Sequence, residues 1–124
     1  MAEMYFTKEH EWIKVEGATG KVGISDHAAH ELGDITFVEL PKPGKTVKQF
    51  EVLAAIESVK AASDIYSPVT GKILTVNAKL DTTPEVVNEN AEEMAWMVEL
   101  EIADVSELSK LMTRQQYDEY LKEL

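Results

Sequence analysis

The chain has 124 residues, enough for one domain with a modest hydrophobic core. It contains no cysteine, which excludes disulfides, thiolate nucleophiles and cysteine-based metal sites, so any redox chemistry must come from a bound group. The formal net charge of −11 disfavours nucleic acid and anionic membrane surfaces as partners, because both would repel the protein.

The first predicted element is a β-hairpin. Strands are predicted over residues 12–15 and 21–25, on either side of a turn over 16–20 that contains two glycines. A turn rich in glycine between two β-branched runs is typical of antiparallel pairing. The N-terminal quarter of the chain is therefore expected to be β-structure.

A short helix and a third strand are predicted next. Ser25 is a suitable N-cap for a helix over 26–32, and Gly33 stands where a left-handed C-terminal cap is common. The β-branched and aromatic run 35–40 then predicts a strand that ends at Pro41, since proline cannot donate to a sheet ladder.

Two further strands are predicted over 51–58 and 61–67, with only Val59 and Lys60 between them. Two-residue hairpin turns usually contain Asn-Gly, Asp-Gly or a leading glycine, because one or both positions need a positive φ. Val-Lys breaks this rule, which predicts either a wider loop or a locally strained turn.

Lys60 is flanked by small side chains on both sides. Ser58, Ala61, Ala62 and Ser63 would leave its ammonium group accessible to another protein at the tip of the hairpin. Taken alone, however, a lysine in such a position is ordinarily just a solvated surface residue.

The C-terminal third is predicted to be a strand followed by helices. Thr83 could cap a helical turn from Pro84 to Asn88, and the alternating run 95–102 predicts the last strand. Asp104 with Glu107, and Thr113 with Gln116, have the spacing of capping boxes, which predicts two short helices. The last helix carries one apolar face, which we expect to pack on the body of the protein rather than on a partner: Tyr117, Tyr120, Leu121 and Leu124.

The remaining motifs give little support for catalysis. His27 and His30 could share a helix face, but no third metal ligand is apparent, so we expect solvated histidines and no metal site. The triplet His10-Glu11-Trp12 lacks the second histidine of a zinc-protease motif, and no phosphate-binding glycine loop or nucleophile elbow is present. The protein is therefore expected not to be an enzyme.

Residues 57–71 read E-S-V-K-A-A-S-D-I-Y-S-P-V-T-G. This segment resembles the lipoyl-attachment segment of the glycine cleavage H-protein family, in which E-S-V-K-A-x-S-D-x-Y-S-P-x-x-G recurs. Similar stretches occur in the same order over nearly the whole chain: 10–12, 22–28, 32–35, 37–41 and 84–88. The chain departs from the family at 91–96, where A-E-E-M-A-W replaces a common P-Y-G-x-G-W, which puts the local backbone and its partner contacts in doubt.

The resemblance implies a mostly β fold, a barrel-sandwich hybrid of two small antiparallel sheets with a short internal helix and C-terminal helices. It implies a single lipoyl-carrier domain over 1–124, with a helical segment from about residue 104. Lys60 would carry lipoate covalently, as N6-lipoyllysine. Glu57 and Asp64 would help a lipoate ligase or lipoyl transferase to recognise the hairpin, and Glu11 could face the amine of the loaded arm.

The same resemblance implies the function of a carrier. The lipoamide arm would shuttle the aminomethyl intermediate of glycine between a pyridoxal-phosphate-dependent glycine decarboxylase, an aminomethyltransferase and dihydrolipoyl dehydrogenase. The location would be cytoplasmic in a prokaryote, or the mitochondrial matrix for a processed eukaryotic chain. No apolar run approaches the roughly 20 residues of a membrane helix.

Three alternatives remain open at this point. An H-like protein that relays lipoyl groups to other carriers would keep the same lysine, and the altered segment at 91–96 leaves room for it. A biotin carrier is disfavoured, because its lysine usually stands between methionines while Val59 and Ala61 flank Lys60. An enzyme that uses His27 and His30 would turn over without any lysine modification.

Overall fold

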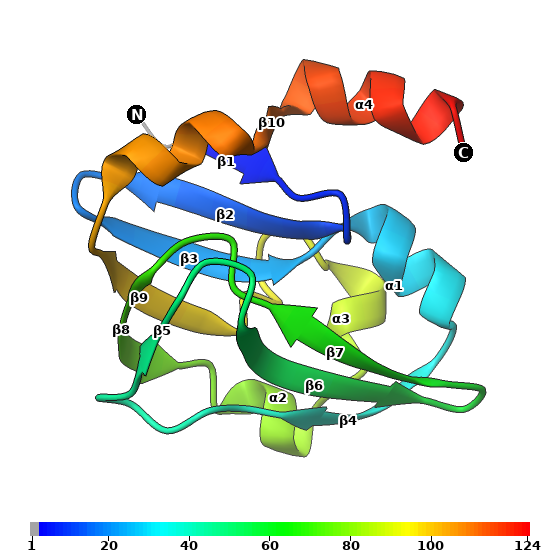
Figure 1. The fold of residues 1–124 in the computed structure, drawn as a ribbon. Helices are drawn as coiled ribbons and strands as arrows, with labels where there is room; N and C mark the ends of the chain where they lie inside the picture. The colour runs from blue at the N-terminus through cyan, green and yellow to red at the C-terminus, as the bar shows by residue number, and fades with distance from the viewer. Residues whose placement is uncertain (1–2) are drawn as a thin grey trace.

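The computed structural model describes residues 3–124, which form two antiparallel sheets (Figure 1). One sheet has seven strands in the order β10-β1-β2-β3-β9-β8-β5, and the other has three strands in the order β4-β6-β7. The strands are β1 (Glu3–Phe6), β2 (Glu11–Glu16), β3 (Thr19–Ile24), β4 (Ile35–Glu39), β5 (Thr46–Val47), β6 (Val52–Ser58), β7 (Ala62–Tyr66), β8 (Gly71–Val76), β9 (Val98–Ile102) and β10 (Met112–Thr113). The predicted mostly β fold of two antiparallel sheets is confirmed, with sheets of unequal size.

Short helices lie around these sheets. They are α1 (Asp26–Leu32), α2 (Lys79–Thr82), α3 (Val86–Glu89), the 3-10 helix η1 (Val105–Lys110) and α4 (Arg114–Lys122). In Figure 1, η1 and α4 cross the outer side of β1 and β2, while α1 lies beside the β6–β7 hairpin. No helix within residues 3–124 is long and apolar enough to span a membrane.

The predicted hairpin at the N-terminus is confirmed as β2 and β3. Pairing extends from Glu11 opposite Ile24 to Glu16 opposite Thr19, so the turn is tighter than the five residues expected. Gly17 has a φ of +64°, a conformation that glycine adopts without a steric penalty. The backbone conformation of the turn therefore favours glycine at position 17.

The predicted start and end of α1 are also confirmed. The Ser25 hydroxyl accepts a hydrogen bond from the backbone N–H of Ala28 at 3.1 Å, as an N-cap does. At the other end, Gly33 donates its N–H to the Ala29 carbonyl and has a φ of +82°. Its ψ of −157° is extended, so the cap has the expected positive φ but is not left-handed helical.

Three expectations for the later elements are wrong. The Thr83 side chain does not cap the helical turn, and α3 begins at Val86 rather than at the preceding proline. The last strand begins at Val98, since the residues before it form a loop. Asp104 does cap η1 through the N–H of Ser106, but the Glu107 carboxylate accepts from Thr70 instead of closing a capping box.

The C-terminal helix α4 packs against the sheet as predicted. Thr113 and Gln116 form the expected capping box, which positions the helix over β1. The Tyr117 ring is buried and stacks on Phe6, with ring centroids 4.3 Å apart. Tyr120 and Leu121 also contact this small core, whereas Leu124 is 67% exposed, so the predicted apolar face holds for three of its four residues.

Candidate functional site

Lys60 lies in the turn that joins β6 to β7. Because β6 ends at Ser58 and β7 begins at Ala62, residues 59–61 form the connection, and the wider-loop alternative is confirmed. Neither Val59 nor Lys60 has a positive φ. The sequence therefore avoids the strain that a two-residue turn would have imposed.

The Ser58 side chain holds this turn together. Its hydroxyl oxygen accepts from the N–H groups of Lys60 and Ala61, at 3.3 and 3.1 Å, and the Ser58 N–H donates to the Ala61 carbonyl at 2.8 Å. The turn is thus built from backbone and serine groups alone. The Lys60 side chain is not needed for its geometry.

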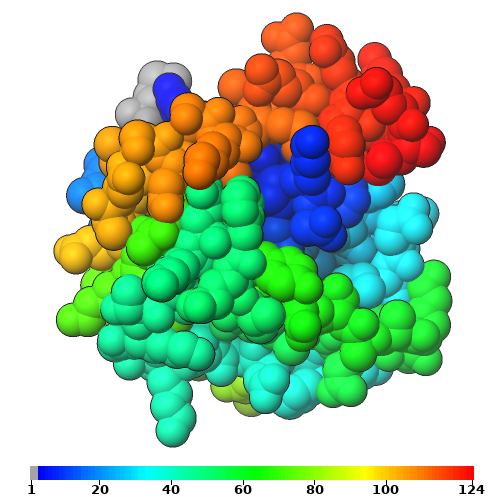
Figure 2. Space-filling model, viewed as in Figure 1, coloured from blue at the N-terminus to red at the C-terminus, as the bar shows by residue number. Residues whose placement is uncertain are grey.

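The turn projects from the body of the protein. Val59 is 69% exposed and Lys60 is exposed too. Figure 2 shows the end of this hairpin at the edge of the molecule, next to α1. Within residues 3–124, the Lys60 ammonium group makes no hydrogen bond or ion pair, so it is available to a modifying enzyme.

Glu57 and Asp64 are exposed on the same hairpin. Glu57 lies opposite Ala62 on the neighbouring strand, and Asp64 is two residues further along that strand. Both carboxylates therefore project from one face of the three-stranded sheet, as diagonal neighbours. The structure brings them to the same surface, close along the strand to Lys60.

Glu11 lies elsewhere, at the start of β2 in the other sheet. It is only 1% exposed, so it is a buried carboxyl group and not a surface carboxylate. Its two carboxylate oxygens accept hydrogen bonds from the Thr7 hydroxyl and from the Tyr66 backbone N–H. Tyr66 is the last residue of β7, so Glu11 meets the hairpin at the end opposite to Lys60.

Burial changes the acidity of Glu11. Loss of solvation raises its pKa to about 7, although the hydrogen bonds from Thr7 and Tyr66 favour the ionised form and oppose the shift. A carboxyl group with this pKa exchanges its proton near neutral pH. Glu11 can therefore be present either as an acid or as a carboxylate under ordinary conditions.

Histidine and tyrosine side chains gather around His10, the residue before Glu11 in the sequence. The Tyr117 hydroxyl lies 2.8 Å from His10 Nδ1 and 2.7 Å from the Ser25 hydroxyl, and the His10 ring lies 4.7 Å from that of His27. Desolvation, with a smaller effect from His27, lowers the pKa of His10. His27 thus contacts His10 rather than sharing a site with His30, and no group of three or more His, Asp or Glu residues within 3–124 could hold a metal ion.

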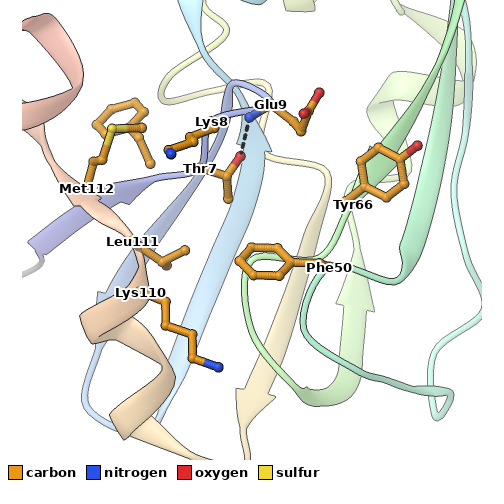
Figure 3. Close-up of a pocket in the computed structure, with 9 residues that line it drawn as sticks. Thr7, Lys8, Glu9, Phe50, Tyr66, Lys110, Leu111 and Met112 are labelled. Carbon is orange, nitrogen blue, oxygen red and sulfur yellow. Dashed lines mark hydrogen bonds between the residues drawn. The ribbon is translucent and has the colours of Figure 1, made fainter. Parts of the chain in front are cut away.

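A pocket of about 450 Å³ is lined in part by the loop that precedes Glu11 (Figure 3). Phe50 lies at its centre in the view, facing Thr7, with Tyr66 to one side and Leu111 to the other. The same figure shows the Glu9 backbone N–H donating to the Thr7 hydroxyl. Thr7 and Tyr66, which donate hydrogen bonds to Glu11, therefore also line this pocket.

Hydrogen bonds and an ion pair hold residues 91–95, the segment that departs from the expected family pattern. The Ala91 carbonyl accepts from the Trp12 indole N–H at 3.0 Å, and Ala95 donates its N–H to Asn90. The Glu92 carboxylate accepts from the Asp26 N–H, at the start of α1, and pairs with Arg114. No residue of 91–95 has a positive φ, so this chain needs no glycine in the segment.

Sequence reasoning missed the residues that hold the site in place. Ser58 is expected from the sequence only to be a small neighbour of Lys60, although serine at the first position of a turn commonly bonds to backbone groups two and three residues on. The contact of Tyr66 with Glu11 joins residues 55 positions apart, and the Thr7 contact, although only four residues away, belongs to no recognised motif. The N–H of Val59 donates to the Asp34 carbonyl at 3.0 Å, which no local pattern indicates.

Comparison with known proteins places this geometry in context. The family model described as "Glycine cleavage H-protein" matches residues 4–124. The glycine cleavage system H protein of Thermotoga maritima is 49% identical over 93% of both chains, and that of Bacillus subtilis is 47% identical over 98% of this chain and 95% of its own. The crystal structure of a glycine cleavage system H protein from Mycobacterium marinum superposes with a TM-score of 0.88, at 30% identity and 97% coverage of both chains.

Proposed function

This chain belongs to the glycine cleavage H-protein family, and from that premise we propose that Lys60 is the site of covalent lipoyl attachment. Proteins of this family are lipoyl carriers and not catalysts, so the chain is a carrier component of the glycine cleavage system. The lipoyl group supplies a disulfide, which this cysteine-free chain cannot supply itself.

The observation that carries the proposal is the turn at Lys60. Because the Ser58 side chain and backbone groups hold the turn, acylation of the lysine would leave every one of these hydrogen bonds intact. The small neighbours Ala61 and Ala62 are exposed and leave room around the lysine. These residues fit an amide-linked prosthetic group that projects into solvent.

We assign recognition by the lipoate ligase or lipoyl transferase to Glu57 and Asp64. Both carboxylates lie on one exposed face of the hairpin that carries Lys60. Acylation changes the net charge from −11 to −12, so the surface around the arm becomes still more acidic. Such a surface favours enzymes with basic entrances to their active sites.

Glu11 is proposed to stabilise the amine of the loaded arm. Gly33, beside Lys60, and Ser25 lie at the two ends of α1, a separation of about 12 Å at the helical rise per residue. Ser25 follows Ile24, which pairs with Glu11. An arm lying along α1 would approach Glu11 from the hairpin. A cationic amine near this carboxyl group would favour its ionised form.

We propose that the arm carries the aminomethyl group from glycine decarboxylase to the aminomethyltransferase and is then reoxidised by dihydrolipoyl dehydrogenase. Tethering replaces diffusion between the three active sites by a high local concentration, provided that the arm reaches each site. Since the relatives described above are bacterial, these partners would be met in the bacterial cytoplasm.

Intact-mass measurement tests the attachment site directly. After incubation with a lipoate ligase, lipoate and ATP, the wild-type chain should gain the mass of one lipoyl group, while Lys60→Arg should gain none. Lys72→Arg, which changes an exposed lysine on β8, is the matched control and should be modified like the wild type. An unmodified wild type, or a modified Lys60→Arg, would contradict the proposal.

A second assay separates glycine cleavage from lipoyl relay. The lipoylated protein should support the exchange of bicarbonate with the glycine carboxyl group when it is mixed with a glycine decarboxylase. Transfer of the lipoyl group from this chain to another carrier, without glycine exchange, would favour the relay function instead.

A further inference from the structure

We propose that Gly33 and Asn88 form a seat for the aliphatic part of the Lys60 side chain, which makes Asn88 a positioning residue for the arm. The inference rests on the proposed role of Lys60 as the attachment site. It adds a contact from α3, an element that the functional proposal does not use.

Gly33 provides the surface of this seat. A Cβ atom at this position would lie 3.2 Å from Lys60 Cε and 3.8 Å from its Cδ and Nζ atoms. The aliphatic part of the exposed lysine side chain therefore passes close to Gly33. The φ of +82° at Gly33 is a second reason for glycine here, because other residues rarely adopt it.

The Asn88 side chain holds Gly33 in place through hydrogen bonds. Its side-chain N–H donates to the Gly33 carbonyl at 2.8 Å, and its side-chain oxygen accepts from the Ile35 N–H, also at 2.8 Å. One amide group thus bridges both ends of the connection between α1 and β4. These are the only two polar groups that this side chain contacts within residues 3–124.

The bridged connection is joined to the hairpin tip at two further points. The N–H of Val59, next to Lys60, donates to the Asp34 carbonyl at 3.0 Å. Ile35 pairs with Ser58, the residue whose side chain holds the turn. Asn88 therefore anchors residues 33–35. This segment contacts both the Lys60 side chain and the turn that carries it.

A restrained stem limits the directions in which the modified lysine can project. The conformational entropy of the side chain is lost when the chain folds rather than when an enzyme binds. A ligase therefore encounters the lysine in one main arrangement. Loss of the Asn88 amide should make the connection between α1 and β4 more mobile, and the Lys60 side chain should then become more mobile too. The two hydrogen bonds involved are partly exposed, so the fold itself should survive their loss.

Proton NMR on the unmodified full-length protein tests the seat without any cofactor. The wild type should show a nuclear Overhauser effect between the Gly33 Hα and Lys60 Hε protons. Asn88→Ala should lose this effect, and its Val59 amide should exchange with solvent about tenfold faster. Asn90→Ala is the matched control, because Asn90 bonds to the Met94 N–H and not to the connection, and it should retain both properties.

Asn88→Asp gives a second test should the alanine variant fail to fold. It keeps an oxygen to accept from Ile35 but places another oxygen against the Gly33 carbonyl, so it should also lose the effect. Retention of the Gly33–Lys60 effect in both folded variants, or its absence in the wild type, would overturn the seat.

Ligase kinetics test the positioning role. With lipoate and ATP saturating, the KM of the ligase for Asn88→Ala should rise about threefold while kcat is unchanged, since only the arrangement before binding differs. An unchanged KM in a variant that has lost the Gly33–Lys60 effect would overturn that role. If the wild type accepts no lipoyl group, the function proposed for Lys60 fails, and the NMR result still decides whether the seat exists.

Discussion

The two ends of α1 border regions of opposite character. At the C-terminal end, the Lys60 turn is exposed and is held by one serine hydroxyl and a few backbone hydrogen bonds. At the N-terminal end, Glu11, Ser25 and Tyr117 are buried. Ser25 and Tyr117 hydrogen-bond to each other, and Glu11 accepts from the distant Tyr66. This carrier thus leaves the ammonium group at its proposed attachment point free of structural contacts, while its buried core and its titrating carboxyl group lie elsewhere.

The largest effect is expected from the buried end, in Tyr117→Ala. Removal of this ring opens a cavity against Phe6 and leaves the Ser25 hydroxyl with the Ala28 N–H as its remaining partner. The free energy of unfolding should fall by about 4 kcal/mol, the usual range for an aromatic core residue replaced by alanine. Urea denaturation would measure it, with Tyr120→Ala, a half-buried residue of the same helix, as the control that loses less.

A pH-dependent effect of intermediate size is expected from Glu11. Its pKa is near 7 in the folded protein against an ordinary value of 4.5, so the folded state binds the proton more tightly than the unfolded state. The stability due to the protonated form is fully present below pH 4.5 and is lost as the pH rises through 7. That loss is about 3 kcal/mol for this difference in pKa.

Glu11→Gln should remove most of this pH dependence, because glutamine is neutral at every pH. The change in the free energy of unfolding between pH 5 and pH 8, from urea denaturation, should be smaller in this variant than in the wild type. Glu9→Gln, which neutralises the exposed neighbouring carboxylate, should keep the wild-type slope. Equal slopes in Glu11→Gln and the wild type would show that the buried group does not titrate in this range.

The smallest effect is expected at the exposed end, in Val59→Ala. This side chain is 69% exposed, and the substitution keeps the backbone N–H that bonds to Asp34. The free energy of unfolding should change by less than about 0.5 kcal/mol, as for most surface positions. A loss comparable to that of Tyr117→Ala in the same denaturation experiment would remove the contrast between the two ends.

Local patterns predicted the elements that depend on neighbouring residues. Ser25 as the cap of α1, the Gly17 turn and the Thr113–Gln116 capping box all involve contacts within a few residues, and all are confirmed. The prediction for the Glu107 side chain is wrong because its partner is Thr70, in the loop between β7 and β8, far away in the sequence. Burial of Glu11 could not be predicted either, since the Thr7 loop and the end of β7 enclose it only in the folded chain.

The serine-held turn also makes position 60 a natural place for chemical labelling. Since no backbone hydrogen bond depends on the lysine side chain, Lys60→Cys would preserve the turn and introduce the single thiol of the whole sequence. A fluorophore or spin label attached there would occupy the place of the arm. Distances from such a probe to a partner enzyme would then report where the tip docks, without any mixture of labelled sites.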